Sequence, residues 1–324
     1  MNLLSLFDGM SCGQIALNRL GIKYDKYFAA EIDKHAIAVT KANYPNTKHL
    51  GDITTVKGED LPPIDLIIGG SPCQGFSFAG KKLNFEDPRS KLFFEFVRLL
   101  RECKPKYFLL ENVRMKKEHE MVITEHLGVS PITINSSLVS AQNRVRLYWT
   151  NIPNIEQPAD KGILLKDILI DGSNQIAAQR GRYLVDEVMP TSKPTIQVVE
   201  LRPDNKSNSL TTVQKDNWVV LDKYKLSDKA IEYMGRLQNG KPRWEYHTNE
   251  LNKKAACLTA NMYNGVPYGV VKELLRRLTP IECERLQTVP DNYTNHVADM
   301  HRYKMLGNGW TVDVICGILK NMKF

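Results

Sequence analysis

The sequence lacks the features that mark membrane and secreted proteins. No run of about 18 apolar residues is present to cross a bilayer, and the amino terminus, Met1 to Leu4, has no basic segment of the kind that begins a signal peptide. The six cysteines never form a CxxC pair, which argues against a zinc ribbon or a thioredoxin-like redox pair. We therefore expect a soluble cytoplasmic protein with reduced thiols and no metal.

The composition is that of a globular protein with a substantial core. The chain has 324 residues, 42% of them hydrophobic, which is enough for one large or two ordinary domains. Neither sign of charge is scarce, since 44 Lys and Arg stand against 36 Asp and Glu and give a formal net charge of +8. This excess favours a polyanionic partner, but many proteins with such a charge never bind nucleic acid.

A glycine-containing turn follows the first expected strand, residues 2 to 6. The turn, Phe7 to Gly13 (FDGMSCG), opens a helix whose apolar positions include Ile15 and Leu20. Such a turn lets a ligand approach the backbone closely and offers it the free N–H groups of a helix start. Because the turn is not GxGxxG, a plain NAD site is disfavoured, whereas another nucleoside-bearing ligand remains plausible.

Acidic residues follow the next two expected strands. The second strand, residues 26 to 30, ends at Glu31-Ile32-Asp33, roughly 20 residues after the glycine turn, where doubly wound folds commonly place an acid that binds a ribose. Asp52, in Gly51-Asp52-Ile53, comes after a third strand and could meet an adenine amino group. A solvated loop aspartate is the alternative for Asp52.

One cysteine stands in a turn of Gly, Ser and Pro directly after a buried strand. The apolar run 64 to 68 predicts a parallel strand, and Gly69 to Ser77 (GGSPCQGFS) follows it. Open α/β sheets bind ligands at the carboxyl ends of their strands, so Cys73 is a candidate nucleophile. A buried structural cysteine is the alternative, and the loop alone does not decide. The polar segment 79 to 88 has the composition of a mobile loop.

The next strand along the chain brings a glutamate to the same region. Residues 90 to 103 read as a core helix and residues 107 to 110 as a buried strand, which Glu111-Asn112-Val113 follows. In a parallel sheet this strand end lies beside the cysteine loop. A glutamate that leaves an apolar strand into a cleft can donate a proton to a bound group, although it can also simply reach water.

Two arginines precede a later apolar strand. Gln142-Asn143-Arg144-Val145-Arg146 leads into the run 147 to 150, and strand alternation puts Arg144 and Arg146 on one face, opposite Val145. The arginines could bind a phosphate or a base carbonyl, or pair with surface acids, which is the usual role of exposed arginines.

The chain changes character between residues 171 and 268. Strands become short, turns frequent and helical periodicity poor, apart from residues 228 to 237, which predicts a smaller, loop-rich domain. Polar turns such as 207 to 212 can hydrogen-bond base edges and phosphates, but an ordinary loop would look similar. We expect a catalytic domain of residues 1–170 completed by 301–324, and a small domain with a hinge over 171–300.

Regular structure returns near the carboxyl terminus. Thr279-Pro280-Ile281-Glu282 is a capping box with proline at the first helical position, which predicts a helix through Gln287. Leu306-Gly307-Asn308-Gly309-Trp310 then reads as a second glycine turn that opens a terminal helix.

Taken in order, these segments resemble the DNA cytosine-5 methyltransferase family. The matching segments are Phe7-Asp8-Gly9 with Gly13 (first motif), Gly70 to Gln74 (catalytic loop), Glu111-Asn112-Val113 (glutamate motif), Gln142 to Arg146 (QxRxR motif), and Arg277 to Pro290 and Gly307-Asn308 (last two motifs). Because the matches follow the family's order over nearly the whole chain, chance is a remote explanation.

The sequence departs from the common bacterial pattern in two motifs. Ser5 stands where many bacterial members have aspartate, and the first turn reads DGMSCG rather than AGxGG. In this turn and in Gly307-Asn308-Gly309-Trp310 the chain looks more like the animal de novo methyltransferases. The variable segment is compact for the family, which implies a short recognition site.

The resemblance implies an α/β fold, a Rossmann-like S-adenosylmethionine-dependent methyltransferase sheet with a smaller, loop-rich target-recognition domain. It also implies a sequence-specific methyl transfer to C5 of a cytosine flipped out of double-stranded DNA. The Cys73 thiolate would add to C6, Glu111 would contact N3 and the exocyclic amine, and Arg144 would donate to O2. Arg146 completes the expected catalytic set. A free thiol is mostly protonated at neutral pH, and the sequence shows no activator for it.

The resemblance also assigns binding residues. The cofactor, S-adenosyl-L-methionine with S-adenosyl-L-homocysteine as product, would be held by Phe7, Asp8, Gly9, Met10, Cys12, Gly13, Glu31, Ile32, Asp52, Ile53, Pro72, Asn308, Gly309 and Trp310. The duplex would be contacted by Gln74, Ser77, Arg89, Ser90, Gln142, Thr211 and Thr212. A cognate restriction endonuclease is a further partner that the resemblance allows, in the cytoplasm of a bacterial or phage-infected cell.

Three other functions were weighed against DNA methylation. A zinc cytidine deaminase needs HxE and PCxxC, but position 76 is Phe and none of the seven histidines is followed by Glu two residues on, so this reading fails. An RNA (tRNA) cytosine-5 methyltransferase shares the fold and motifs and is disfavoured only because the small domain resembles a target-recognition domain. A catalytically silent DNA-binding partner subunit is disfavoured by the intact Cys73, Glu111 and Arg144.

Overall fold

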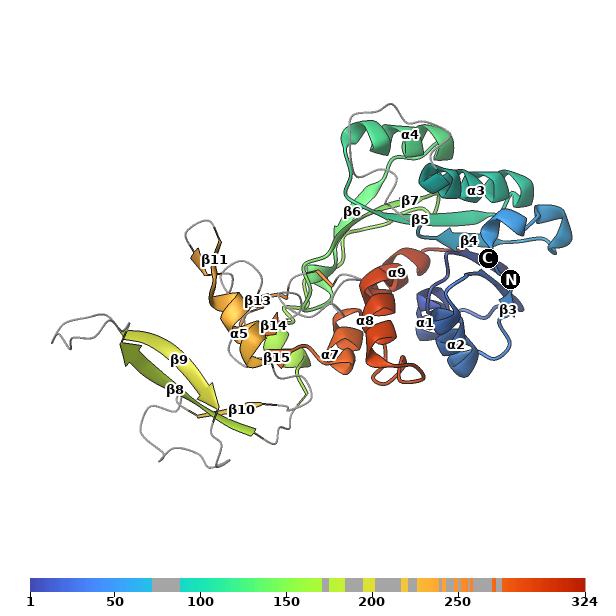
Figure 1. Cartoon of the computed structure of the whole chain (residues 1–324). Coiled ribbons are helices and arrows are strands. Elements are labelled where there is room, and N and C mark those ends of the chain that lie inside the picture. The colour runs from blue at the N-terminus through green and yellow to red at the C-terminus, as the bar shows by residue number, and fades with distance from the viewer. Residues whose placement is uncertain are drawn as a thin grey trace.

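The structure of the chain is a computed structural model with a large α/β domain and a group of short strands at one end (Figure 1). It describes residues 1–71, 88–170, 175–183, 195–201, 217–220, 226–238, 241–242, 248–249, 252–255, 257–258, 270–271 and 276–323. No helix in this described part is long and apolar enough to cross a membrane.

A seven-stranded mixed sheet in the order β3-β2-β1-β4-β5-β7-β6 forms the centre of the large domain. Its strands are β1 (Asn2–Leu6), β2 (Lys26–Ala30), β3 (Lys48–His49), β4 (Leu66–Gly69), β5 (Tyr107–Val113), β6 (Ile132–Asn135) and β7 (Val145–Thr150). The strands β3, β2, β1, β4 and β5 are parallel, whereas β7 runs antiparallel to β5 and β6. Because β7 runs backwards, its first residues lie where β4 and β5 end.

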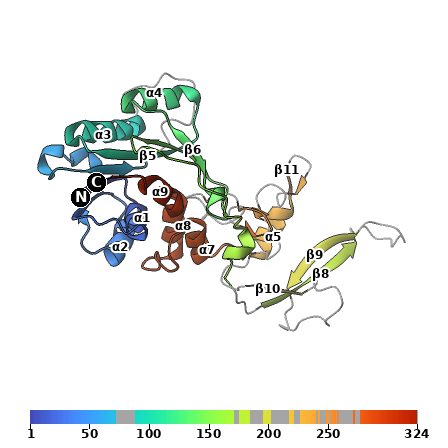
Figure 2. The same ribbon diagram turned by 180° about the vertical axis from the view of Figure 1, so that it is seen from behind.

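Helices cover both faces of the sheet, which explains why its strands are nearly continuous apolar runs. The helices of this domain are α1 (Cys12–Arg19), α2 (Lys34–Asn43), α3 (Pro88–Cys103), α4 (Lys117–Leu127), α7 (Pro280–Leu286), α8 (Asp299–Asn308) and α9 (Val312–Leu319). Figures 1 and 2 show α3 and α4 on one face and α1, α8 and α9 on the other. Along β1, Leu3 packs into the core under α1 and α9, and Leu4 packs into the core under α3 and α4.

The sequence predicted the first two strands at the bounds that the structure has, and the fold class is confirmed. The capping box is also present, since Thr279 Oγ1 accepts from the backbone N–H of Glu282 and the Glu282 carboxylate accepts from that of Thr279. The helix expected over 90 to 103 begins two residues earlier, at Pro88.

Two segments differ from their prediction. Glu111 to Val113 were expected after a strand, but β5 continues through Val113 because it pairs with β7 along this stretch. Leu306 to Asn308 were expected to form a turn, but they are the last residues of α8, a helix that the sequence analysis did not predict. The turn before α9 is confined to residues 309 to 311.

The helices α7 to α9 belong to the core of the sheet. Cys283, Leu286, Leu306 and Ile315 are fully buried in the same cluster as Leu3 of β1. The domain boundary expected at residue 300 falls one residue inside α8 and does not match this packing. The hydrophobic periodicity of the sequence could not predict that these helices pack on the sheet, because α7 and α8 are short and separated by a turn-rich stretch.

The remaining described strands form small sheets. A three-stranded antiparallel sheet has the order β10-β8-β9, with β8 (Gln175–Tyr183), β9 (Thr195–Leu201) and β10 (Asn217–Val220). Around α5 (Asp228–Gly235) lie β11 (Leu237–Gln238), β12 (Lys241–Pro242), β13 (Thr248–Asn249), β14 (Val270–Val271) and β15 (Arg276–Arg277). The sheet β10-β8-β9 lies away from the seven-stranded sheet (Figures 1 and 2), whereas Val271 of β14 is buried in the same core cluster as Leu3 of β1.

Candidate functional site

A glutamate at the end of β2 fixes the turn after β1 through hydrogen bonds to the backbone. Phe7, Gly9 and Ser11 have positive φ angles of 58°, 57° and 62°, which gives the turn a sharply folded backbone. The backbone N–H of Gly9 donates to Glu31 Oε2 at 2.8 Å, and the N–H groups of Ile32 and Asp33 both donate to Oε1 at 2.8 Å. Glu31 therefore ties the glycine turn to the end of the neighbouring strand.

A second carboxylate, Asp8, lies inside the same turn. The Tyr27 hydroxyl donates to Asp8 Oδ1 at 2.8 Å, and the Ser11 hydroxyl donates to Oδ2. Burial raises the pKa of Asp8 to about 6, even though hydrogen bonds from Ser11, Ser5 and Tyr27 act to lower it. Ser5 of β1 thus contacts the buried carboxylate of Asp8, three residues later in the chain.

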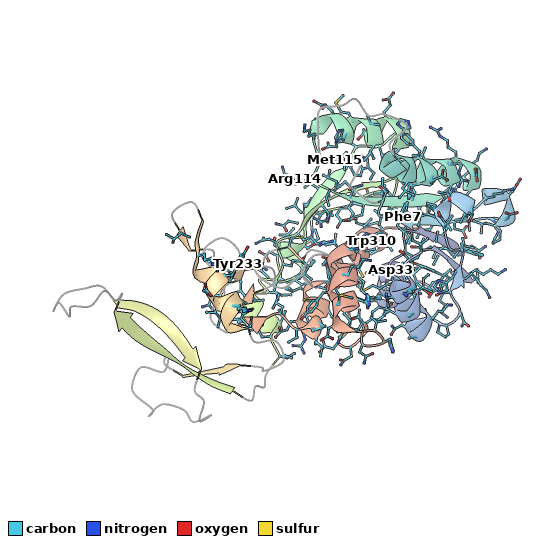
Figure 3. All side chains as sticks on the ribbon, viewed as in Figure 1. Phe7, Asp33, Arg114, Met115, Tyr233 and Trp310 are labelled. Carbon is cyan, nitrogen blue, oxygen red and sulfur yellow. The ribbon has the colours of Figure 1, made fainter. Side chains whose placement is uncertain are left out.

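A cavity of about 710 Å³ opens in front of this turn. All of the predicted cofactor residues line it except Gly13 and Pro72. Gly13 packs instead against β4, where a Cβ would come within 2.3 Å of Ile68 Cδ1. Pro72 lies outside the described residues. Figure 3 shows three lining residues, Phe7, Asp33 and Trp310, which come from distant parts of the chain and lie in the same region of the large domain.

The sequence analysis missed an ion pair at the rim of the cavity. Lys304 Nζ of α8 lies 2.8 Å from Asp33 Oδ2 at the start of α2, and both residues line the cavity. Burial raises the pKa of Asp33, but Lys304 and the backbone N–H of His35 outweigh that effect and lower it overall. Asp33 has a sequence signal, since aspartate is a common helix N-cap. Lys304 has none, because α8 was not predicted.

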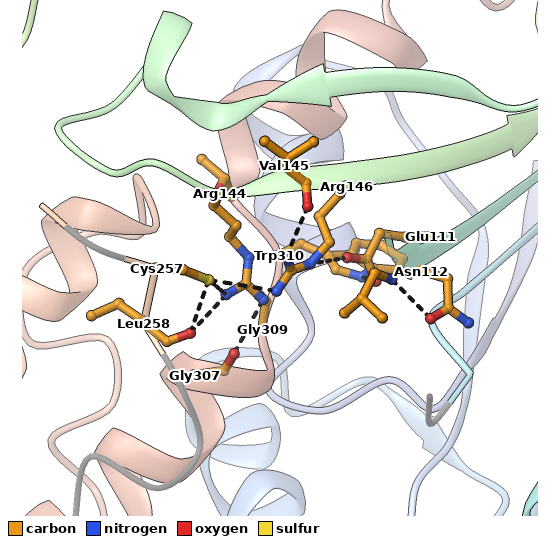
Figure 4. Close-up of polar contacts among 12 residues, drawn as sticks. Glu111, Asn112, Arg144, Val145, Arg146, Cys257, Leu258, Gly307, Gly309 and Trp310 are labelled. Carbon is orange, nitrogen blue, oxygen red and sulfur yellow. Dashed lines mark hydrogen bonds and ion pairs between the residues drawn. The ribbon is translucent and has the colours of Figure 1, made fainter. Parts of the chain in front are cut away.

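The other end of the cavity is built around Glu111, which is 8% exposed. Arg146 Nε donates to Glu111 Oε1 at 3.0 Å, and Trp310 Nε1 donates to Oε2 at 3.2 Å (Figure 4). The indole and the carboxylate meet over Gly70, where a Cβ would lie 3.0 Å from both Trp310 Nε1 and Glu111 Oε2. A side chain at position 70 would therefore force the indole and the carboxylate to shift by a few tenths of an ångström.

The ends of β4 and β5 are joined by a hydrogen bond. Asn112 Nδ2 donates to the carbonyl and the hydroxyl oxygens of Ser71, at 3.3 and 3.2 Å. This confirms that the glutamate motif lies beside the start of the cysteine loop. Cys73 itself lies outside the described residues, as do Gln74, Ser77, Thr211 and Thr212. Arg89 and Ser90 lie in the first turn of α3, where only the backbone is described.

The guanidinium of Arg144 is occupied by protein acceptors. Arg144 is 3% exposed; its Nη1 donates to Leu258 O at 3.0 Å, and its Nη2 donates to the carbonyls of Gly307 and Gly309 at 3.1 and 2.9 Å. The prediction that Arg144 donates to a bound base does not fit this geometry, because its donors hold the end of α8. Arg146 is the arginine that faces Glu111.

Gln142 is likewise committed to the protein interior. It is fully buried; its Nε2 donates to Leu286 O at 3.1 Å, and its Oε1 accepts from the N–H of Leu258 at 2.7 Å. The prediction that Gln142 contacts DNA does not fit this burial. The side chain instead joins β7, α7 and the segment around Leu258.

Comparison with known proteins identifies the family. A family model for C-5 cytosine-specific DNA methylase matches residues 1–324. Type II methyltransferase M1.ScrFI of Lactococcus lactis subsp. cremoris is 31% identical over 99% of this chain and 77% of its own length. The orphan methyltransferase M.SPRI of Bacillus phage SPR is 27% identical over 99% of this chain and 97% of its own length.

Solved structures share the fold. A DNA modification methyltransferase described as putative, encoded within an Escherichia coli prophage, has a TM-score of 0.66 at 24% identity and covers 99% of this chain and 98% of its own. The Dnmt2 methyltransferase of S. pombe has a TM-score of 0.63 at 16% identity, covering 99% and 97%. With the family model matched from the first residue to the last, the chain belongs to the C-5 cytosine-specific DNA methylase family and is a DNA (cytosine-5-)-methyltransferase.

Proposed function

We propose that this chain transfers the methyl group of S-adenosylmethionine to C5 of a cytosine flipped out of double-stranded DNA, at a short specific sequence. The observation that supports this most directly is that one cavity of about 710 Å³ reaches from the glycine turn at Gly9 to Glu111 and Arg146. A direct methyl transfer requires donor and acceptor in one cavity, because the reacting atoms must approach within about 3 to 3.5 Å.

The acceptor groups and the apolar surface at the glycine-turn end suit a nucleoside without phosphate. Glu31 and Asp52 supply carboxylate oxygens for ribose hydroxyls and an adenine amino group, and Ile32, 75% exposed, offers an apolar surface for the adenine ring. Of the cations on the described lining, Lys304 is paired with Asp33 and Arg144 with backbone carbonyls, while Arg146 is paired with Glu111 at the other end of the cavity. Bound there, S-adenosylmethionine supplies an electrophilic methyl group.

At the other end, Glu111 and Arg146 would hold the cytosine. We assign N3 and the exocyclic amine to Glu111, and we assign O2 to Arg146 rather than to Arg144. As the Cys73 sulfur bonds to C6, electron density rises on the ring, and a guanidinium near O2 stabilises it. C5 would then take the methyl group and leave S-adenosylhomocysteine; a water molecule would accept the C5 proton, and the C6–S bond would break to release the Cys73 thiolate and restore the aromatic ring.

Trp310 would fix the orientation of Glu111. Its indole N–H donates to one carboxylate oxygen while Arg146 donates to the other. Both oxygens therefore keep a defined direction, which pre-organises the glutamate for the base.

The proposal is tested by incubating the protein with labelled S-adenosylmethionine and either duplex DNA or tRNA. Label in the duplex, an adduct trapped on 5-fluorocytosine DNA, and loss of both in Cys73→Ser would support it. Label in tRNA alone would refute the DNA substrate, and substantial transfer by Cys73→Ser would refute the nucleophile. Bisulfite sequencing of the product would then give the recognition sequence.

A partner endonuclease is a further part of the proposal. Relatives of this chain include both a type II methyltransferase and an orphan methyltransferase of a phage, so homology supports either arrangement. We propose that the enzyme acts on DNA in the cytoplasm of a bacterial or phage-infected cell. Resistance of its methylated product to a type II enzyme of the same sequence specificity, encoded beside it, would establish a restriction pair.

A further inference from the structure

A cysteine outside the recognised motifs lies between the two arginines of the site. Cys257 Sγ accepts from Arg144 Nη1 at 3.3 Å and lies 3.7 Å from Arg146 Nη2 (Figure 4). Its own S–H faces the carbonyl of Leu258 at 3.3 Å. The thiol thus has two donors and one acceptor around it, which is a complete hydrogen-bonding environment.

The backbone around this cysteine is fastened to the large domain. The Ala255 N–H donates to Ala141 O at 2.6 Å, and the Asn143 N–H donates to Ala255 O at 2.8 Å. On the other side of the thiol, the Leu258 N–H donates to the buried Gln142 amide. Although Cys257 comes from the part of the sequence expected to form the small domain, its position is set by the residues that lead into β7.

The chemistry of a cysteine side chain suits this position. A carboxylate here would pair with Arg146 and draw it away from Glu111, whereas an apolar side chain would leave guanidinium N–H groups without an acceptor. Sulfur is a weak, polarisable acceptor, so it can satisfy those groups without competing with a carboxylate. Arg146 also donates from Nη1 to its neighbour Val145 O at 2.9 Å, which leaves Nε for Glu111.

We propose that Cys257 is a positioning residue for the target base, holding the Arg146 guanidinium in the orientation in which Nε meets Glu111. This inference rests on the proposed roles of Glu111 and Arg146. It also gives the segment from the small-domain part of the chain a direct contact with the arginine pair.

The test compares Cys257→Ala, which removes the acceptor, with Cys257→Ser, which keeps one, and Cys257→Asp, which adds a charge. Cys103→Ala is the matched control, since Cys103 is also partly buried and lies at the end of α3, away from the cavity. We expect kcat on duplex DNA to fall about tenfold in Cys257→Ala and about a hundredfold in Cys257→Asp, with Cys257→Ser within about threefold of wild type. The KM for the cofactor and the Tm should not change.

A second readout does not depend on turnover. The ¹H–¹⁵N resonance of Arg146 Nε–H, assigned by its loss in Arg146→Lys, should be present in the wild type and in Cys257→Ser and shifted or broadened in Cys257→Ala. Wild-type kcat and an unchanged resonance in Cys257→Ala would overturn the proposal. Equal losses of kcat and Tm in the Ala and Ser variants would also overturn it, by showing a purely structural role. If the wild type transfers no methyl group to DNA, the proposed function fails, and the resonance still decides the positioning role.

Discussion

Replacing Asp8 by asparagine is expected to stabilise the free protein at neutral pH. The pKa of Asp8 is raised by burial from 3.8 to about 6, so the folded state holds its proton more tightly than the unfolded state. The stability that this provides is fully present below about pH 4 and is lost as the pH rises through about 6. At pH 7 to 8 the wild type therefore contains an ionised carboxylate that burial disfavours, and the amide removes that charge.

The expected gain in stability follows from the size of the pKa shift of Asp8. A change of about 2 pKa units corresponds to about 3 kcal/mol at full ionisation, at about 1.4 kcal/mol per unit. Asp8 also faces the cavity, so we expect about 1 to 2 kcal/mol, which is a few degrees in Tm for a chain of this size. Asparagine can keep both contacts, accepting from Tyr27 and donating to the Ser11 oxygen.

The assay is thermal and urea unfolding of the wild type and Asp8→Asn at pH 5, 7 and 8, with the exposed Asp60→Asn as control. The variant should gain stability over the wild type as the pH rises. A positively charged cofactor in the same cavity favours the ionised Asp8, so the variant should bind S-adenosylmethionine about tenfold more weakly at pH 8. The reasoning would be refuted if the difference in unfolding free energy between variant and wild type did not change with pH. It would also be refuted if the variant were less stable than the wild type at pH 8.

Four further substitutions test the base end of the cavity. Trp310→Phe removes the donor to Glu111 and should lower kcat about tenfold with little change in Tm; an unchanged kcat would show that Glu111 needs no such support. Gly70→Ala places a methyl group 3.0 Å from the indole and the carboxylate, so kcat should fall at least tenfold, and a fully active variant would contradict the packing. Arg146→Lys should abolish most activity and leave Tm nearly unchanged. Arg144→Lys should instead lower Tm by several degrees, because it leaves buried carbonyls unpaired. If Arg144→Lys lost activity at an unchanged Tm and Arg146→Lys lost stability, Arg144 would again be the arginine assigned to O2 of the base.

The local signals of the sequence predicted a large part of this structure. The strands β1 and β2 are short, largely apolar segments, the glycine turn after β1 uses positive φ angles, and the capping box begins α7 where the sequence places it. Each of these signals is contained within a few residues, so it can be read without knowing what packs against it. The same holds for the acids that follow β2 and β3, which the structure places on the lining of the cavity.

Features that depend on contacts between segments far apart in the sequence were harder to predict. The direction of β7 depends on its pairing with β5 and β6, and that pairing also extends β5 to Val113. The packing of α7 and α8 against the sheet depends on contacts with residues near the amino terminus, such as the hydrogen bond from the Tyr293 hydroxyl to Met10 O at 2.7 Å. Neither feature leaves a periodic signal, because the segments involved are short.

The two arginines show why residue type and alternation were insufficient to assign the site. Arg144 and Arg146 are two residues apart before an apolar strand, so any rule based on spacing gives them the same face. Their difference comes from acceptors more than 100 positions away in the sequence: the carbonyls of Leu258, Gly307 and Gly309 surround Arg144, and only Arg146 has a carboxylate. Because the Nη1 and Nη2 donors of Arg144 are all directed at protein acceptors, whereas Arg146 meets the carboxylate that faces the cavity, we propose Arg146 as the arginine that contacts the base. The sulfur of Cys257, which contacts both, then becomes part of what keeps the two roles separate.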